Sequence, residues 1–367
     1  MVPLVLVSLI CGSSALGDSA RMGPIALKTI GFYLATTALA ITVALLVAVA
    51  ISPGSGVELA GEADFVAAKA PPLVDVLVGI VPSNPIQAMA EGNMLQIIVF
   101  ALLFGYAISH AGESGRRIAS FFSDTEAVIM KMVLILMSFA PYGVFALLAK
   151  LFAEMGIGAI MDLAAYFFTV LGVLLFHGLV NYSLLLKVLS GMSPRVMLTK
   201  MRPVWAFAFS TASSGATLPV TMRTVEHRLG VHNTVGGFTV PLGATINMDG
   251  AGIRIAISAA FAANVIGVPL DFVTMLEIVL IGTLASIGTA GVPGVGLITL
   301  ALVLEQAGLP VEGVALIIGV DRLLDMVRTM VNVTGDATVA VIVGKSENQL
   351  DEAVFNNPRA DLESNRE

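Results

Sequence analysis

A stripe of charged and amide side chains runs along an apolar segment near the end of the chain. In GVDRLLDMVRTMVNVTGDATVAVIV, residues 319–343, these polar side chains recur at helical spacing; they are Asp321, Asp325, Arg328, Asn332 and Asp336. At 100° per residue the five side chains lie within about 80° of one another on a helix. The segment therefore predicts a helix with one polar face, which its apolar neighbours would place inside a membrane.

The residue types in this stripe favour one class of small molecule. Arg328 offers a planar fork that can bind a carboxylate at two points. Asp325 can accept an ammonium group, and Thr329 and Asn332 can bind the remaining polar atoms. An acidic amino acid would use all of these groups. A C4-dicarboxylate is the alternative, although it brings no ammonium to Asp325, and Arg328 disfavours a neutral amino acid.

A second polar cluster interrupts the apolar run at PLGATINMDGAG, residues 241–252. Asn247 and Asp249 are oxygen donors, and unwound backbone here would free the carbonyls of Gly243 and Thr245. Hard cations prefer oxygen ligands, and broken transport helices use such carbonyls for sodium. Met248 does not fit this pattern well, since a thioether is a weak donor of electrons to a cation. We therefore expect an unwound helix that supplies ligands to a small cation, and Asp336 suits the same task.

Composition places these clusters in a membrane protein. The chain has 367 residues, 57% hydrophobic and 12% charged, with a mean hydropathy of +0.92. Runs at 25–51, 128–152 and 160–189 are long enough to span a bilayer as helices. An acid or arginine at the bilayer centre costs roughly 2.5–3.5 kcal/mol, so the polar stripe indicates function. The single Cys11 excludes a disulfide framework.

Other function classes find little support in the residues. The four histidines have no metal-binding spacing and are expected at interfaces or in packing. No nucleophile–base pair stands out, so an enzyme is disfavoured, while an anion conductance remains open as a secondary activity. With Asp249, Asp325 and Asp336 against Arg328 the site carries a charge of −2. An acidic amino acid would then cross near neutrality with about three monovalent cations.

Two segments predict hairpins that enter the membrane from opposite faces. STASSGATLPVT, residues 210–221, and ASIGTAGVPGVG, residues 285–296, each interrupt an apolar run with small residues, glycine and proline. Positive residues flank the first segment, which places its ends in the cytoplasm, and acids flank the second. Paired interrupted segments of this kind mark the binding site of transporters built from inverted repeats. The polar residues from 345 onward lack periodicity and are expected to have no regular structure.

Four motifs together carry a family resemblance. ASSGATLPVT, PLGATINMDG, ASIGTAGVPGVG and LDMVRTMVNVTGD occur in this order, and the chain resembles the glutamate transporter family, the dicarboxylate/amino acid:cation symporters. The resemblance implies a multi-pass, all-α, elevator-type homotrimer in the cell inner membrane. It also implies acidic amino acid transport coupled to sodium, or to protons in other members. It implies no prosthetic group and no nucleic-acid partner.

The resemblance also implies a division of the chain. Residues 1–17 would form part of a scaffold helix, 72–152 the remaining scaffold, 25–51 and 160–343 the mobile transport domain, and 345–367 a cytoplasmic tail. The two hairpins, near 203–224 and 273–309, would act as gates. The family's first transmembrane helix and half of the second have no counterpart, which favours a misassigned start.

Site residues follow from the resemblance by matching motifs. The substrate would contact Ser213, Ser214, Val292, Gly296, Asp325, Arg328, Thr329 and Asn332. One sodium would use Asp336 with the carbonyls of Gly243, Asn247 and Asn332; a second would use Met248 and the carbonyls of Thr245, Ser286, Ile287 and Thr289; a third would use Tyr33, Thr36, Thr37, Asn247 and Asp249. Met248 favours sodium, because proton-coupled relatives tend to have leucine there.

Two positions depart from the family pattern close to the site. Ala251 stands where members usually have threonine, and Arg254 stands where they have tyrosine or another uncharged residue. Many members instead carry an arginine at the positions of Ala212 or Met326. Our hypothesis is that Arg254 supplies this missing charge from the neighbouring helix.

Overall fold

The structure is a computed structural model, and it is helical throughout its described part. It describes residues 22–55, 81–91, 94–137, 158–265, 267–287, 313–358 and 360, with isolated residues before 15. Within these ranges the only strand-like pairing is an isolated antiparallel bridge between Val231 and Leu350. The prediction of an all-α protein is thus confirmed for the described part of the chain.

The described residues form helices in most of their length. These helices are α2 Met22–Ile51, α4 Pro85–Glu91, α5 Met94–His110, α6 Gly112–Met137, α8 Gly158–Phe176, α9 Tyr182–Ser190, α10 Pro194–Thr211, α11 Ser214–Arg223, α12 Asn233–Ile246, α13 Asp249–Val265, α14 Phe272–Ile287, α16 Gly313–Ser346 and α17 Glu352–Asn356. One π-helical turn, His177–Asn181, joins α8 to α9 without a break, and another, Thr224–Arg228, follows α11.

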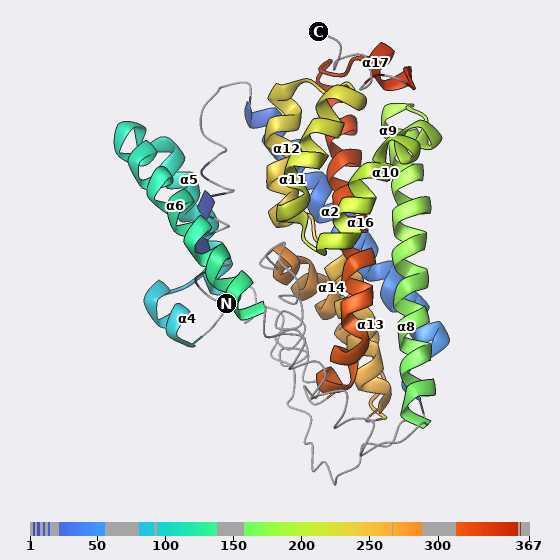
Figure 1. Cartoon of the computed structure of the whole chain (residues 1–367). Helices are drawn as coiled ribbons and strands as arrows, with labels where there is room; N and C mark the ends of the chain where they lie inside the picture. Colours follow the sequence, from blue (N-terminus) through green and yellow to red (C-terminus); the bar gives the residue numbers. More distant parts are fainter. Residues whose placement is uncertain are drawn as a thin grey trace.

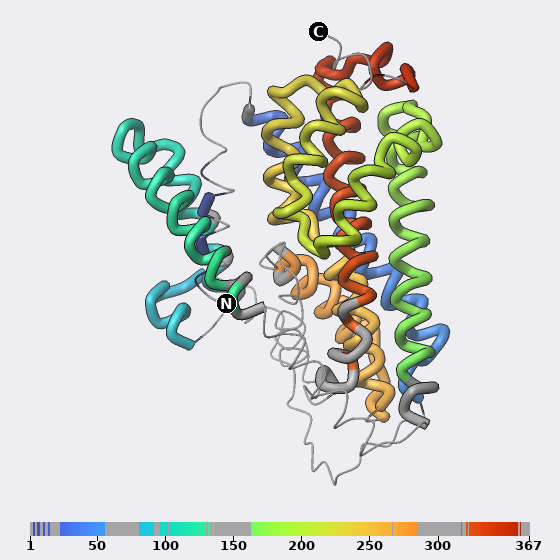
Figure 2. The backbone as a smooth tube through the Cα atoms, viewed as in Figure 1, coloured from blue at the N-terminus to red at the C-terminus, as the bar shows by residue number. Residues whose placement is uncertain are grey.

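Helix α16 forms the centre of the main bundle (Figure 1). It packs against α2, α8, α9, α10, α11, α12 and α13. Helix α2 lies along α13, and small residues such as Ala40, Ala44 and Ala48 allow this close packing. Helices α5 and α6 pair with each other and stand beside the bundle, as the backbone trace also shows (Figure 2).

Among the described residues, three helical segments are long and apolar enough to cross a membrane: Gly23–Ile51, Leu163–Ser190 and Leu323–Ser346. The first two match the runs predicted at 25–51 and 160–189. The run predicted at 128–152 is different, because α6 already begins at Gly112 with a polar half. The prediction was based on apolar residues alone, so it did not include the polar first half of this helix. The remainder of that run, from residue 138, lies outside the described residues.

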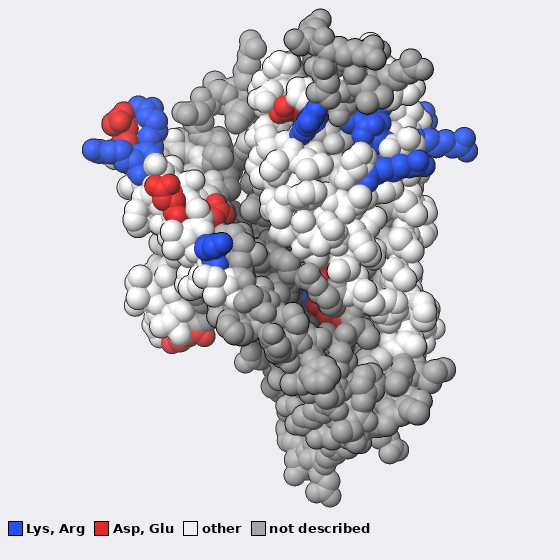
Figure 3. Space-filling model, in the orientation of Figure 1, with Lys and Arg blue, Asp and Glu red and all other residues white. Residues whose placement is uncertain are grey.

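Charged side chains are distributed unevenly over the visible surface (Figure 3). Lys and Arg gather at the end of the bundle where the C-terminus lies and at one end of the α5–α6 pair, while the middle of this face has little exposed charge. This pattern agrees with an orientation in which the positive end faces the cytoplasm.

In the segment predicted to form the first re-entrant hairpin, the structure has two helices, α10 and α11, joined by a tight turn. Pro194 begins α10 after Ser193, so the first arm starts nine residues before the predicted position 203. Ala212 adopts a left-handed conformation at the tip, and the Ser213 side chain accepts a hydrogen bond from the Ala216 amide, which begins α11. Of the segment predicted to form the second hairpin, 273–309, only the part in α14 lies within the described residues.

The exposed Asp271 precedes α14 and caps its N-terminus. Its carboxylate accepts a hydrogen bond from the Thr274 amide at 2.7 Å, and this bond to the charged form lowers the pKa of Asp271.

The segment after α16 is ordered as far as it is described, so the prediction of an unstructured tail is wrong for residues 347–357. Asp351 accepts hydrogen bonds from two amides and caps α17. The ammonium group of Lys200, buried on α10, donates to the carbonyls of Val354 at 2.9 Å and Phe355 at 2.7 Å. It also donates to the Arg228 carbonyl at 2.6 Å, so one lysine connects the hairpin to the C-terminal segment.

We predict that Lys200→Met releases the C-terminal segment, because a buried ammonium makes these three bonds and bonds from charged groups contribute about 1.5–3 kcal/mol each. Hydrogen exchange at residues 350–357 should become faster. Lys345→Met is the control, since Lys345 pairs with Glu352 at the surface, where ion pairs contribute about 0–1 kcal/mol. Equal exchange in the two variants would contradict this role of Lys200.

Candidate substrate and cation site

Helices α12 and α13 are separated by a break of two residues inside the predicted segment 241–252, but the Gly243 carbonyl is not freed, because α12 continues to Ile246 and this carbonyl accepts from the Asn247 amide at 2.8 Å. Helix α12 ends at Ile246, Asn247 has φ −84° and ψ 81°, and α13 begins at Asp249. Helix α16 holds this break through Asn332. The Asn332 side-chain oxygen accepts from the Gly250 amide at 2.8 Å, and its side-chain nitrogen donates to the Met248 sulfur at 3.2 Å.

Asn247 and Asp336 form an oxygen-rich pair beside the break. The Asn247 side chain donates to Asp336 Oδ1 at 2.9 Å and to the Asn332 carbonyl at 3.2 Å. Its own oxygen, Oδ1, is buried and has no hydrogen-bond partner among the described residues. Gly243 faces this pair, and a Cβ atom there would lie 2.3 Å from Asp336 Oδ1. An unpartnered buried oxygen beside a carboxylate fits a small hard cation.

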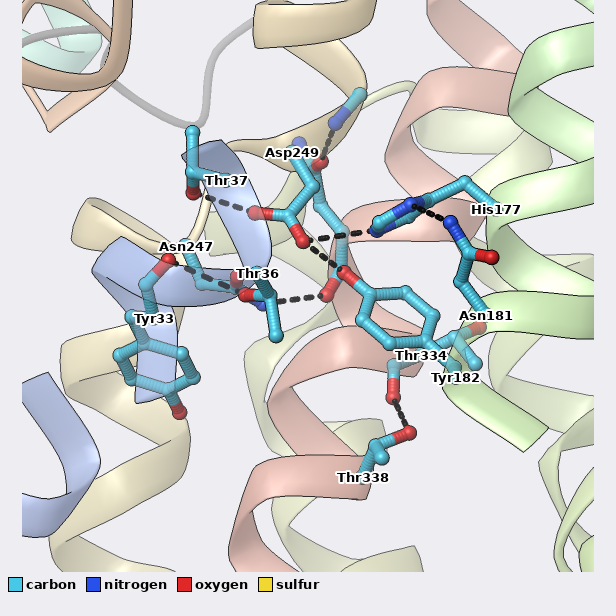
Figure 4. Close-up of polar contacts among 12 residues, drawn as sticks. Tyr33, Thr36, Thr37, His177, Asn181, Tyr182, Asn247, Asp249, Thr334 and Thr338 are labelled. Atoms are coloured by element: carbon cyan, nitrogen blue, oxygen red, sulfur yellow. Dashed lines mark hydrogen bonds and ion pairs between the residues drawn. The ribbon is translucent and has the colours of Figure 1, made fainter. Parts of the chain in front are cut away.

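Asp249 collects hydrogen bonds from three helical segments (Figure 4). The hydroxyl of Thr37 on α2 donates to Oδ1. On the other oxygen, Oδ2, the Tyr182 hydroxyl donates at 2.6 Å and His177 Nε2 lies at 3.0 Å. All four side chains are buried. Asp249 also lies in the first turn of α13, where the helix dipole stabilises negative charge.

Asn181 fixes the tautomer of His177. Its side-chain nitrogen, which can only donate, lies 3.0 Å from His177 Nδ1. Nδ1 is therefore the acceptor, and the ring proton sits on Nε2, where it points to Asp249. A neutral imidazole thus orients this carboxylate, in the way that histidine–carboxylate pairs orient metal ligands.

The predicted face of Tyr33, Thr36 and Thr37 is only partly directed at Asp249. All three residues are buried on α2, but the Tyr33 hydroxyl donates to the Thr239 carbonyl at 2.8 Å and the Thr36 hydroxyl donates to the Tyr33 carbonyl at 3.1 Å. Only the Thr37 hydroxyl contacts Asp249. Helical threonines commonly bond their own backbone, and Thr36 does so here.

A chain of alternating charges lies nearer the start of α16. Arg328 donates through Nη2 to Asp325 and through Nη1 to Asp321 Oδ1, the latter at 3.5 Å. The same Asp321 oxygen accepts from Arg254 Nη1 on α13 at 3.2 Å. At most 5% of each of these residues is exposed. Pairing makes such burial tolerable, since an unpaired charge here would be strongly unfavourable.

The remaining predicted residues fall into three groups. Thr329, Thr245 and Ser286 donate to carbonyls of their own helices. Ser213 and Ser214 form the tip of the first hairpin, with Ser214 buried. Thr289, Val292 and Gly296 lie outside the described residues, and Ile287 is described only as the last residue of α14.

Three contributors were missed or misjudged from the sequence. Asp321 was recognised in the stripe but was not given a role, and His177 and Tyr182 were not considered as partners of Asp249. A histidine, an asparagine and a tyrosine at 177, 181 and 182 in an apolar run were the available signal. Their spacing places 177 and 181 near one face of an α-helix but turns 182 away from 177, and it does not say which residue they meet.

Together, the fold and the site define a multi-pass helical membrane protein whose charges meet in its interior. Within the described ranges, no three His, Cys, Asp or Glu side chains are grouped to bind a transition metal. The acceptors at the break are amide, carboxylate and hydroxyl oxygens, which suit alkali and alkaline-earth ions.

Comparison with known proteins identifies the family. The sequence profile of the sodium:dicarboxylate symporter family matches residues 1–346, and the chain belongs to this family. It is 32% identical to a proton/sodium-glutamate symport protein of Geobacillus stearothermophilus, over 96% of this chain and 85% of that protein. It is also 32% identical to the proton/glutamate-aspartate symporter of Escherichia coli, over 96% and 83%. A C4-dicarboxylate transport protein of Rhizobium leguminosarum shares 32% identity, over 96% and 81%.

We predict that His177→Leu destabilises the folded protein by about 1–3 kcal/mol, because the buried Asp249 carboxylate loses one donor. His177→Gln keeps a side-chain N–H near the same place and should retain most of the stability. Thermal unfolding of the detergent-solubilised protein measures both. His227→Leu, at an exposed position, is the matched control. If the Leu and Gln variants at 177 unfold at the same temperature, the bond to Asp249 contributes nothing.

Proposed function

We propose that the protein is a secondary active symporter that imports an acidic amino acid, L-aspartate or L-glutamate, together with sodium ions. One observation carries this proposal. Arg328 and Asp325 form a buried recognition pair on α16, and Asn332, one turn further along, is bonded to the broken helix that carries Asn247. Groups suited to an amino acid and groups suited to a cation would therefore share one helix, one turn apart.

To bind the substrate, Asp325 and Arg328 would exchange each other for groups of the substrate. In this structure Asp325 and Arg328 neutralise each other. A substrate with a side-chain carboxylate and an ammonium group can replace both halves of this pair without leaving a buried charge unpaired. Asn332, the hydroxyl of Thr329 and the tips of the two hairpins, at Ser213, Ser214, Val292 and Gly296, would hold the α-carboxylate.

Sodium would enter as a co-transported ion. The unpartnered Asn247 oxygen, Asp336 and the neighbouring carbonyls offer the oxygen ligands that a first site needs. Asp249 with Thr37 supports a second site, and Thr245, Met248 and the second hairpin a third. The relatives named above include proton/sodium- and proton-coupled symporters, so sodium coupling is our inference from the oxygen ligands and Met248.

The mechanism we propose is an elevator movement within a homotrimer. The transport domain would comprise α2 and residues 160–343, and the scaffold would comprise the helices of 72–152. The separation of the α5–α6 pair from the bundle around α16 supports this division (Figure 1).

A C4-dicarboxylate:cation symporter is the second candidate. The relative from Rhizobium leguminosarum supports it, and so does the presence of two buried arginines, Arg254 and Arg328. Asp325 argues against it, since a dicarboxylate offers no ammonium to replace Arg328 as its partner.

Uptake into vesicles tests the proposal directly. We expect an inward sodium gradient to drive accumulation of labelled L-aspartate or L-glutamate, and unlabelled L-aspartate to compete. A potassium gradient of equal size serves as the control. Accumulation of succinate without either amino acid would replace the first candidate by the second, and a proton gradient acting alone would contradict sodium coupling.

Asp325→Asn should separate amino acids from dicarboxylates. The amide cannot neutralise an ammonium group, so the apparent affinity for L-aspartate should fall about tenfold or more, equivalent to about 1.4 kcal/mol. Competition by succinate should be retained, because Arg328 remains. An equal loss for both ligands would mean that Asp325 only positions Arg328.

Asp336→Asn should act on the cation. Removing this carboxylate should raise the half-saturating sodium concentration about tenfold or more, because a formal charge beside the Asn247 oxygen is lost. Asp271→Asn is the control, since this exposed cap lies outside the bundle interior and asparagine also caps helices. An unchanged sodium dependence would remove Asp336 from the cation site.

A further inference from the structure

Arg254 has hydrogen-bonding capacity that the described protein does not use. It lies on α13 between Ile253 and Ile255, and none of its surface is exposed. Its Nη1 donates to Asp321, but Nε and Nη2 find no partner among the described residues. Buried donors without partners are rare in native proteins, and a charged donor is the most costly case. Some function or ligand must compensate for this arrangement.

The two unused nitrogens form one edge of the guanidinium. Their N–H bonds point in parallel, which matches the two oxygens of a carboxylate. Asp321 occupies the remaining nitrogen and thereby holds the plane of the group. The free edge is therefore a preformed two-point site for an anion.

Neighbouring polar groups do not use this edge. Asp321 accepts Arg254 through Nη1 only, and Asp325 pairs with Arg328. The Tyr166 hydroxyl, on α8, is bonded to Ser258 at 2.8 Å. Two guanidiniums, those of Arg254 and Arg328, thus lie around one Asp321 oxygen, and each can present donors to a second anion.

We propose that the Nε–Nη2 edge of Arg254 binds a carboxylate of the transported substrate, which makes Arg254 a specificity-determining residue. The side-chain carboxylate of the substrate then meets two guanidiniums, those of Arg328 and Arg254, the α-carboxylate keeps the partners proposed for it above, and the ligand class is a small dicarboxylate. Asp325 binds an ammonium group when the ligand carries one. The inference rests on the proposed function for the identity of the ligand, and it applies to either candidate, since acidic amino acids and C4-dicarboxylates both carry two carboxylates.

A simpler role for Arg254 would be to neutralise Asp321. Substitution by lysine distinguishes the two roles, because lysine can neutralise Asp321 but cannot bind a carboxylate at two points. Arg254→Lys keeps the positive charge for Asp321 but removes the two-point edge. Arg254→Met combined with Asp321→Asn removes both charges and keeps the balance. Arg202→Lys is the matched control, because Arg202 is exposed on α10.

The test measures ligand-induced thermal stabilisation of the purified protein in lipid nanodiscs with saturating sodium. The ligands are L-aspartate, L-glutamate and succinate, titrated separately, and stabilisation reports binding independently of transport. We expect Arg254→Lys to unfold at the temperature of the unsubstituted protein when no ligand is present. Its apparent affinity for every dicarboxylate that stabilises the unsubstituted protein should be weaker by about tenfold or more. The charge-balanced double variant should show the same loss.

Opposite results would overturn the inference. If Arg254→Lys or the double variant binds these ligands within twofold of the unsubstituted protein, Arg254 only neutralises Asp321. The same conclusion follows if no dicarboxylate stabilises the unsubstituted protein. Failure of sodium-driven uptake with an intact, Arg254-dependent stabilisation would overturn the proposed function and leave the carboxylate site standing.

Discussion

The carboxylates inside this bundle must be compensated, because a charge in an apolar interior is unstable without donors or counter-ions. Asp321 and Asp325 are compensated by guanidiniums, and Asp249 by three donors from α2, the π-helical turn and α9. Asp336 receives one amide hydrogen bond, from Asn247, among the described residues. Compensation is thus weakest where α16 faces the broken helix. A cation bound here, as proposed above, would supply the compensation that Asp336 lacks.

The balance of charge explains why ions and substrate would move together. Around α16 and the broken helix, the buried carboxylates at 249, 321, 325 and 336 face two guanidiniums, at 254 and 328, so these groups carry a net charge of −2. A net charge of −2 was also predicted from the sequence for Asp249, Asp325, Asp336 and Arg328. Including Arg254 and Asp321 does not change this net charge, because their two charges cancel. An acidic amino acid makes the interior still more negative. Crossing an apolar layer near neutrality then requires about three monovalent cations, a coupling enforced by electrostatics.

Sequence reasoning located the elements of the site but not most of their partners. The stripe on α16 and the break near Asn247 were predictable, since helical periodicity and isolated polar residues are local properties of the chain. The bonds from His177 to Asp249 and from Arg254 to Asp321 join residues 72 and 67 positions apart. Such pairs depend on how helices pack, which no local pattern encodes. The ordered tail was missed similarly, because its main contact is Lys200 on α10.

Asn332 lies between the groups proposed for the substrate and those proposed for the cation. Its side chain holds Met248 and Gly250 on either side of Asp249, and its carbonyl accepts from Asn247. Arg328 lies one helical turn away on the same face of α16. A cation that draws in the Asn247 oxygen or the nearby carbonyls would therefore shift the same residue that borders the substrate position. Linkage makes this effect reciprocal, so a bound substrate would strengthen cation binding by the same free energy. Symport requires this coupling. Contact between the interrupted helix α12–α13 and the continuous helix α16 would carry it over a short distance.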